Sequence, residues 1–298
     1  MSVISIQTKK MGDLQTVAEV AKTDLLIVHD GSGMKTVSMD DLVGKDMDVL
    51  TAKVTGVESD IAPLIYNGIA HNSIYRGKYL GASVTAEQYA AISDGTFEDL
   101  YIGDYWTMGG INYRIAAFDY YWNCGDRGDT LPPHHAVIVP DASLYSASMN
   151  DTDTTVGGYA GAKMRTSYIS SAKTTVLAAF SGHVLNHRIY LVNAISNGIS
   201  AGGVWGDGEV DIMNEQMVYG GSIFSPAVIN NSYPANQRVE KSQLPLFAMN
   251  PAMVNIRENY WLRDVISAGH FARVEESGNA SYYNASASHG VRPSFCIS

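Results

Sequence analysis

Cysteine, basic residues and long apolar runs are all scarce in this chain of 298 residues. Its two cysteines, Cys124 and Cys296, are too few for a disulfide scaffold or a four-thiolate metal site, although a single bond between them stays open. The 20 Lys and Arg face 30 Asp and Glu, a net charge of −10 that argues against nucleic-acid binding, because phosphates need a basic surface. No stretch approaches the roughly 18 apolar residues of a membrane span. The first residues lack the apolar core of a secretory signal. We therefore expect no nucleic-acid partner and no membrane insertion.

What the chain does contain is typical of a folded protein with many turns. Hydrophobic residues make up 46% of it, whereas charged residues make up 17%, below the usual share of about 25%. Glycine and tyrosine are abundant instead, with 28 and 18 residues. This composition predicts short strands, frequent turns and an aromatic, polar surface. The length fits one large domain, or one medium domain with an appendage.

The first 42 residues predict a small appendage. Two β-prone runs, Leu25–Asp30 and Met34–Ser38, flank a loop that contains Gly31 and Gly33. Such runs around a glycine-containing loop are typical of a β-hairpin.

Apolar residues between positions 43 and 66 follow one another at alternating intervals of four and three, the spacing of a coiled-coil seam. They are Val43, Met47, Leu50, Val54, Val57, Ile61 and Leu64. Val54 and Val57 occupy the two kinds of core position in this seam, and valine at both favours a three-stranded coiled coil over a two-stranded one. The alternative is an amphipathic helix that packs on its own domain. Gly44 and Gly56 weaken the helix, and Pro63 should end or kink it.

From about residue 71 the pattern is that of an α+β domain. A capping box, Thr85 to Gln88, opens a short helix that stops near Gly95, and apolar residues at four-residue spacing predict a longer helix over 161–181. Strands are expected at 100–106, at 111–117 with one face buried, at 136–140, and in the C-terminal runs 259–263, 270–274 and 291–297. The tract 197–250 shows little regular patterning. We expect the first and last strands of the domain to lie side by side.

Several histidines and acidic residues invite a metal assignment that the spacing does not support. His134 with His135, and His183 with His187, lack the glutamate of a zinc-protease motif. The run that starts at residue 150 resembles a calcium loop, but its sixth and twelfth places hold Val156 and Ala162. We therefore predict turn chemistry there, and neither a metal nor a cofactor.

Catalysis is likewise not indicated. Cys124 has no base that the sequence assigns to it, and the chain lacks a phosphate-binding loop and a nucleophile elbow. The tripeptide Arg127–Asp129 matches one that some adhesins present to integrins, although a Gly/Asp turn explains it equally well. We expect a protein that is not an enzyme.

The C-terminal segment alternates apolar framework residues with side chains suited to contact. Tyrosine supplies broad contact area at low entropic cost, and Asn and Ser supply adaptable hydrogen bonds, as in an antibody paratope. The alternative is an ordinary polar loop between strands. These contact side chains are His270, Arg273, Glu275, Glu276, Asn279, Ser281, Tyr282, Tyr283, Asn284 and His289.

The runs WLR at 261–263 and GVRPSF at 290–295 resemble the end of C-type-lectin-like domains in bacteriophage tail and fibre proteins. Some of those domains are the variable proteins of diversity-generating retroelements. The runs at 102–106, 113–121, 134–141 and 149–155 are similar to such proteins too, so the likeness spans 71–298. The segment 25–42 resembles N-terminal pieces of phage fibres.

The resemblance implies a C-type-lectin-like fold with two helices and short antiparallel strands, often as a homotrimer. It implies ligand binding through side chains on the last strands, without chemistry, and adds Ile266 to the contact residues. Scaffold roles fall to Trp261, Arg263, Gly290, Arg292 and Pro293. Sulfatase-modifying enzymes share a related fold and use cysteines, but this chain has only Cys296 late in its sequence, so that activity is not supported.

Together these observations predict a virion adhesin that is assembled in the cytoplasm of a bacterial host. Residues 1–42 would attach to a virion structural protein, 43–66 would trimerise, and 71–298 would bind a host cell-surface glycan or protein. Three alternatives stay open: a structural capsid or tail decoration, a glycan hydrolase of the fibre, and a bacterial ligand-binding protein.

Overall fold

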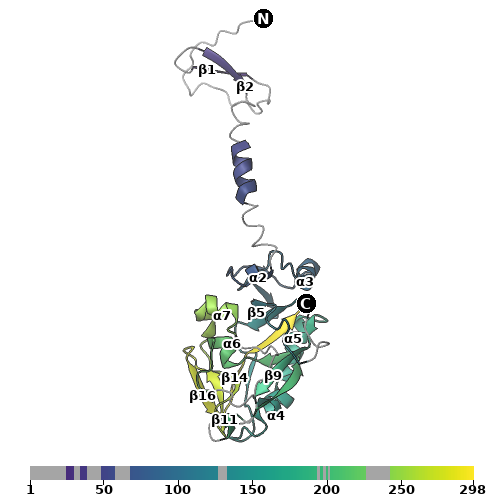
Figure 1. Ribbon diagram of the computed structural model, residues 1–298, viewed down its shortest axis with the longest axis vertical. Coiled ribbons are helices and arrows are strands. Elements are labelled where there is room, and N and C mark those ends of the chain that lie inside the picture. The colour runs from purple at the N-terminus through teal and green to yellow at the C-terminus, as the bar shows by residue number, and fades with distance from the viewer. Residues whose placement is uncertain are drawn as a thin grey trace. The chain divides into compact units, whose positions relative to one another are not determined.

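The computed structural model describes residues 25–29, 34–38, 48–57, 68–126, 133–192, 195–196, 199–200, 202–225 and 242–298. The chain divides into two compact units, Met1–Ala62 and Pro63–Ser298 (Figure 1). Among the described residues, no helix combines the length and the apolar character that crossing a membrane requires.

The first unit contains a pair of strands and a helix. Strands β1 (Leu25–His29) and β2 (Met34–Ser38) pair antiparallel, so the predicted hairpin strands are confirmed. A helix covers 48–57, inside the predicted coiled coil. Its apolar side chains Leu50, Val54 and Val57 are 54%, 48% and 59% exposed. The remaining predicted seam residues, Val43, Met47, Ile61 and Leu64, lie outside the described residues.

A seven-stranded sheet forms the centre of the second unit. Its path runs β13-β18-β6-β5-β4-β3, with β8 also pairing with β18, and only β3 and β4 run parallel. The strands are β3 (Tyr79–Gly81), β4 (Tyr105–Met108), β5 (Ile111–Phe118), β6 (Ala136–Pro140), β8 (Val184–Leu185), β13 (Val210–Ile212) and β18 (Pro293–Ile297). The expectation that the first and last strands are neighbours is wrong, because β6, β5 and β4 separate β18 from β3.

A second sheet of five strands carries the C-terminal segment. Its order is β16-β15-β14-β17-β7, with β14 and β17 parallel and the other pairs antiparallel. The strands are β7 (Tyr145–Ala147), β14 (Tyr260–Val265), β15 (His270–Val274), β16 (Ala280–Asn284) and β17 (His289–Val291). Two smaller pairs join β9 (His187–Val192) to β12 (Gly203–Gly208) and β10 (Ile195–Ser196) to β11 (Ile199–Ser200). Strand β16, yellow in Figure 1, forms an edge.

The helices confirm one predicted boundary and correct another. Helix α3 (Ala86–Ser93) begins at the predicted capping box, in which Thr85 and Gln88 bond reciprocally. The helix expected over 161–181 is divided into α4 (Gly158–Gly161), a π-helical turn η3 (Met164–Tyr168) and α5 (Ser170–Ala179). In the π-helical turn the Ile169 N–H donates to the Met164 carbonyl, five residues back, at 2.8 Å.

More short helices are present than the two expected. They are α2 (Gly68–His71), α6 (Glu215–Tyr219), α7 (Pro245–Met249) and the 3₁₀ turn η4 (Pro251–Val254). Helix α6 and strands β12 and β13 fall in the tract 197–250, where the sequence shows little regular patterning. Segments of three to six residues are too short to show a hydrophobic period. Helices beside mixed sheets make this unit an α+β fold, as the sequence predicts.

Strand β5 is buried on both faces rather than on one. Every residue from Tyr113 to Phe118 is buried, including Arg114. Arg114 is tolerated there because its guanidinium donates to Asp141 at 2.8 and 2.5 Å. The guanidinium also lies 4.5 Å from the centre of the Tyr105 ring. A buried charge needs such a partner, and this one lies 27 residues later in the chain.

Candidate functional site

The framework of the C-terminal segment is buried and tightly bonded. Trp261 is fully buried, and its indole N–H donates to the Ala147 carbonyl at 2.9 Å. The Arg292 guanidinium donates to the carbonyls of Pro140 and Met253 at 2.8 and 3.0 Å. Gly290 has no room for a Cβ, because the Ser143 side chain lies where that atom would go. These residues hold β14, β17 and β18 in place.

Strand β16 presents the exposed aromatic residues of the segment. Tyr282 and Tyr283 are 44% and 46% exposed, and Asn284 is exposed beside them. Successive side chains of a strand point to opposite faces. The two tyrosines therefore lie on opposite faces of the sheet, and the contact residues form two clusters on either side of one edge instead of a single patch.

The first cluster, named here the Arg273 cluster, comprises Arg273, Glu275, Tyr283 and His289. The Arg273 guanidinium lies 4.5 Å from the centre of the Tyr283 ring and donates to His289 Nε2 at 3.1 Å. A longer contact of 3.5 Å joins it to Glu275. Burial, with a further contribution from Arg273, lowers the pKa of His289 to about 4. The imidazole is therefore neutral near pH 7 and accepts the hydrogen bond from Arg273.

The second cluster, named here the Tyr282 cluster, comprises Phe224, His270 and Tyr282. The Tyr282 ring meets the Phe224 ring edge to face, with centroids 5.3 Å apart, and the His270 ring at 5.5 Å. The His270 ring nitrogen Nδ1 is 2.6 Å from the Ser267 hydroxyl. Phe224 and its neighbour Ile223 are 43% and 52% exposed. Sequence reasoning missed both residues, because they lie in the tract that shows no periodicity.

A buried carboxylate fixes the loop that carries Phe224. Glu215, which is fully buried, accepts hydrogen bonds from the backbone N–H groups of Ile223, Phe224 and Ser225 at 3.0 to 3.3 Å. It also accepts from the Ser225 hydroxyl at 2.6 Å. This fourfold acceptor holds Phe224 against Tyr282.

The end of β16 is joined to the loop that resembled a calcium site. Asp153 accepts from the Asn284 amide at 2.9 Å, and from the backbone and hydroxyl of Ser286 at 3.0 and 2.6 Å. Asp151 pairs with Lys163 and accepts from Tyr168 at 2.6 Å. Both carboxylates therefore bind side chains or backbone of the protein itself. In the described part of the chain no group of three or more His, Cys, Asp or Glu is arranged to hold a metal ion.

The other predicted contact residues are scattered. Ile266 is partly buried and packs against the core. Glu276 and Asn279 are exposed near the turn between β15 and β16, and Ser281 lies opposite Arg273 in the strand register.

Four histidine and cysteine residues that the sequence offers for metal binding, catalysis or a disulfide are part of the packing of the fold. His187 begins β9 rather than sharing a helical face with His183, and burial lowers its pKa to about 3. The His183 ring stacks on Tyr89 at 3.4 Å. Cys124 and Cys296 are buried and form no disulfide. The tripeptide Arg127–Asp129 lies outside the described residues.

Comparisons of the chain with models of protein families, with curated proteins and with solved structures found no match.

Proposed function

We propose that this protein is an adhesin of a bacteriophage virion that binds a host cell-surface glycan or protein through the two clusters of strand β16, without catalysis. In this proposal residues 71–298 have a C-type-lectin-like fold. Residues 1–42 attach to a virion structural protein, and residues 43–66 form a trimeric coiled coil.

The exposure of Tyr282 and Tyr283 on an edge strand is the observation that carries the proposal. Large aromatic side chains at nearly half exposure give contact area at small entropic cost, and tyrosine is enriched where proteins bind partners. Their neighbours are held before any ligand arrives: Arg273 by His289, and Phe224 by the Glu215 acceptor. Preorganisation of this kind lowers the entropic cost of binding.

The exposed apolar side chains of the helix at 48–57 support the oligomeric part. Leu50, Val54 and Val57 are each about half exposed in a single chain. A coiled coil would bury them between copies. A trimer would carry three copies of strand β16, and three copies would bind a cell surface with avidity that one copy lacks.

A small pocket among the described residues bears on the hydrolase alternative. It has a volume of about 250 Å³ and is lined by Glu87, Glu98 and Asp99. A hydrogen bond from its own backbone N–H lowers the pKa of Glu87. Burial by itself raises the pKa of Asp99, but hydrogen bonds from Arg76 and Lys78 bring it below its ordinary value. Glu87 and Asp99 therefore lack the raised pKa that a glycosidase acid needs, and these two carboxylates give the hydrolase alternative no support.

Adsorption of the purified chain to bacterial cells tests the proposal. The strain that propagates virions carrying this chain is incubated with labelled full-length protein, with the Tyr282→Ala/Tyr283→Ala variant, and with Tyr79→Ala as a matched control, because Tyr79 is 52% exposed on a different sheet. We expect the double variant to fold and to lose adsorption, and the control to adsorb normally. Equal adsorption by the double variant would overturn the proposal that strand β16 binds the cell surface. Absence of adsorption by the unmodified protein would favour the structural decoration.

A further inference from the structure

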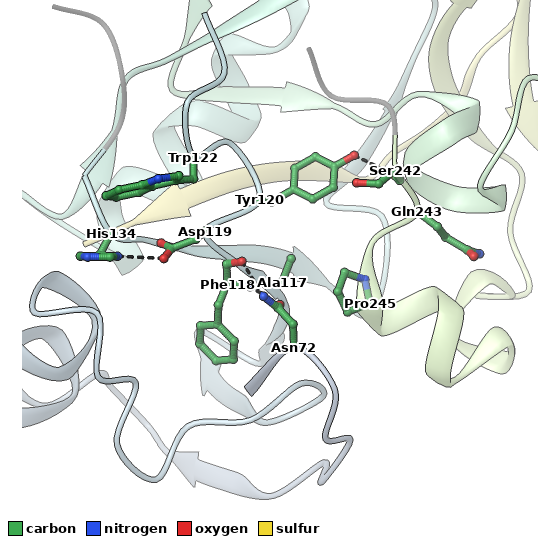
Figure 2. A pocket seen from close by; sticks show the side chains of 10 residues that line it. All are labelled: Asn72, Ala117, Phe118, Asp119, Tyr120, Trp122, His134, Ser242, Gln243 and Pro245. Carbon is green, nitrogen blue, oxygen red and sulfur yellow. Dashed lines mark hydrogen bonds and ion pairs between the residues drawn. The ribbon is translucent and has the colours of Figure 1, made fainter. Parts of the chain in front are cut away.

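Two cavities lie at opposite ends of strand β5. The cavity where β5 ends, drawn in Figure 2, is lined by side chains that already bond to the fold. There His134 donates to Asp119 at 2.8 Å, and the Tyr120 hydroxyl donates to the Ser242 carbonyl at 2.6 Å. The cavity where β5 begins has a volume of about 450 Å³, within the range of about 300–1,000 Å³ typical of small-molecule sites. It differs from the first because it holds a polar group without a partner.

The walls of this second cavity are mostly apolar. Strand β5 contributes Ile111 and Tyr113, which are two positions apart and therefore point to the same face of the sheet. Helix α5 contributes three residues, and the turn before β5 and the chain after β3 contribute the rest. These further lining residues are Thr175, Ala178, Ala179, Met108, Gly109, Ala82 and Ser83. All nine lining residues are uncharged.

The turn between β4 and β5 leaves one side of the cavity open. Gly109 and Gly110 have φ +59° and +79°. Positive φ at both positions is what a two-residue turn of type I′ requires, and glycine adopts it without strain. A Cβ added to Gly109 would meet no atom within 4 Å, so the space beside the turn is free.

Tyr113 brings an unpartnered hydroxyl to the cavity. The residue is 1% exposed, and its ring makes edge-to-face contacts with Phe180 and Phe295, with centroids 5.1 and 6.1 Å apart. Its hydroxyl makes no hydrogen bond within the described part of the chain. The hydroxyl is nevertheless not one of the unpartnered side-chain atoms that are closed to solvent, so it is reached from the cavity that Tyr113 lines.

The surroundings of Tyr113 narrow the class of ligand. Burial raises the pKa of Tyr113, so the phenol keeps its proton near neutral pH and can donate it. A ligand oxygen that accepts this hydrogen bond would satisfy the one free donor of the ring. The chain is described without a gap from 68 to 126 and from 133 to 192, and these two stretches hold every lining residue. Because those residues are uncharged and mostly apolar, an ion would lose its hydration there without gaining a counter-charge.

We infer that this cavity is a binding site for a small neutral molecule that has an apolar body and one oxygen that accepts a hydrogen bond. The oxygen would accept from the Tyr113 hydroxyl, and the apolar body would pack on Met108, Ile111 and Ala179. The inference does not depend on the adhesin proposal, because none of these residues belongs to either cluster of β16.

Titration of the full-length protein with hexyl methyl ketone, followed by saturation-transfer NMR, tests the inference. Octanoate and octylammonium, of similar length, are the anionic and cationic arms. We expect the ketone to bind more tightly than either ion. Ala178→Trp places a large side chain at the wall of the cavity and should weaken ketone binding about 10-fold or more. Thr174→Trp is the matched control, because Thr174 is exposed on the same helix but does not line the cavity.

Tyr113→Phe removes the hydroxyl and leaves the ring. We expect it to weaken ketone binding about 2- to 10-fold, the effect of one hydrogen bond. Its melting temperature should stay within a degree or two of that of the unmodified protein, because the hydroxyl bonds to nothing in the described fold. A purely structural hydroxyl would give the opposite pair of results, a lower melting temperature and unchanged affinity for the ketone.

The inference is overturned if no ketone binds at millimolar concentration, if Ala178→Trp or Tyr113→Phe binds it as tightly as the unmodified protein, or if either ion binds more tightly. The Tyr282→Ala/Tyr283→Ala variant should bind the ketone normally. An unmodified protein that binds the ketone at this cavity but does not adsorb to cells counts against the adhesin proposal alone.

Discussion

Replacement of Glu215 by Gln should destabilise the second unit and loosen the Tyr282 cluster. The substitution keeps the shape of the side chain but turns one acceptor oxygen into an NH₂ donor. If the amide oxygen takes the place of Oε2, the Phe224 N–H keeps that oxygen at 3.3 Å, but the new buried NH₂ group replaces Oε1 and faces the same N–H at 3.1 Å without an acceptor. The donors that remain, from Ile223 and Ser225, lose a charged acceptor.

The size of the effect follows from these contacts. A buried donor without a partner costs about 1–3 kcal/mol, and hydrogen bonds to a neutral acceptor contribute less than those to a charged one. We therefore expect a loss of about 3 kcal/mol in the free energy of unfolding. For a unit of this size that corresponds to a fall of about 6–12 °C in melting temperature.

Thermal unfolding followed by circular dichroism measures the change, with Glu258→Gln as the control because Glu258 is exposed. The near-ultraviolet signal of the aromatic residues should also decrease as Phe224 leaves Tyr282. A Glu215→Gln protein that melts within a degree or two of the unmodified chain refutes the view that this carboxylate holds the loop.

Two further predictions concern assembly and pH. Val54→Asp should convert a trimer into a monomer in sedimentation experiments, because Val54 lies in the exposed apolar seam; a monomeric unmodified chain, or a variant that stays trimeric, contradicts the coiled coil. Unfolded histidine binds a proton below about pH 6.5, whereas the folded His187 stays neutral down to about pH 3. The unfolded state therefore takes up more protons in that window, and stability should fall as the pH falls, by up to about 1.4 kcal/mol per pH unit. His187→Gln should flatten this slope in denaturant titrations at several pH values; an equally steep slope in the variant would show that His187 is not its cause.

Local sequence patterns predicted the elements whose causes are local. The capping box of α3 needs only Thr85 and Gln88, three residues apart. The apolar pattern over 161–181 predicted a helix but did not show that a π-helical turn interrupts it. Its apolar residues recur every four positions, slightly more than one α-helical turn, and the π-helical turn at Met164–Tyr168 widens the helix so that this spacing stays on one side.

Features that depend on distant partners could not be predicted. Apolar and polar residues alternate in β5, so the sequence predicted a strand with one solvent-exposed face. Nothing near Arg114 in the sequence reveals that Asp141 pairs with the Arg114 charge and allows it to be buried. The exposed tyrosines were identified from composition, but the strand that places them on opposite faces was not. Phe224 and its contact with Tyr282 were missed for the same reason. Each depends on residues brought together by the fold, such as Glu215 with Phe224, or Asp119 with His134.

Photo-crosslinking tests the proposed contact between β16 and the host surface most directly. A benzophenone amino acid replaces Tyr283 in one variant and Tyr79 in another, and each protein is irradiated on cells that adsorb the unmodified chain. We predict a covalent adduct between position 283 and a component of the cell envelope, and none from position 79. Adducts from position 79 alone, or from neither position while adsorption persists, would show that the cell is bound by another part of the protein.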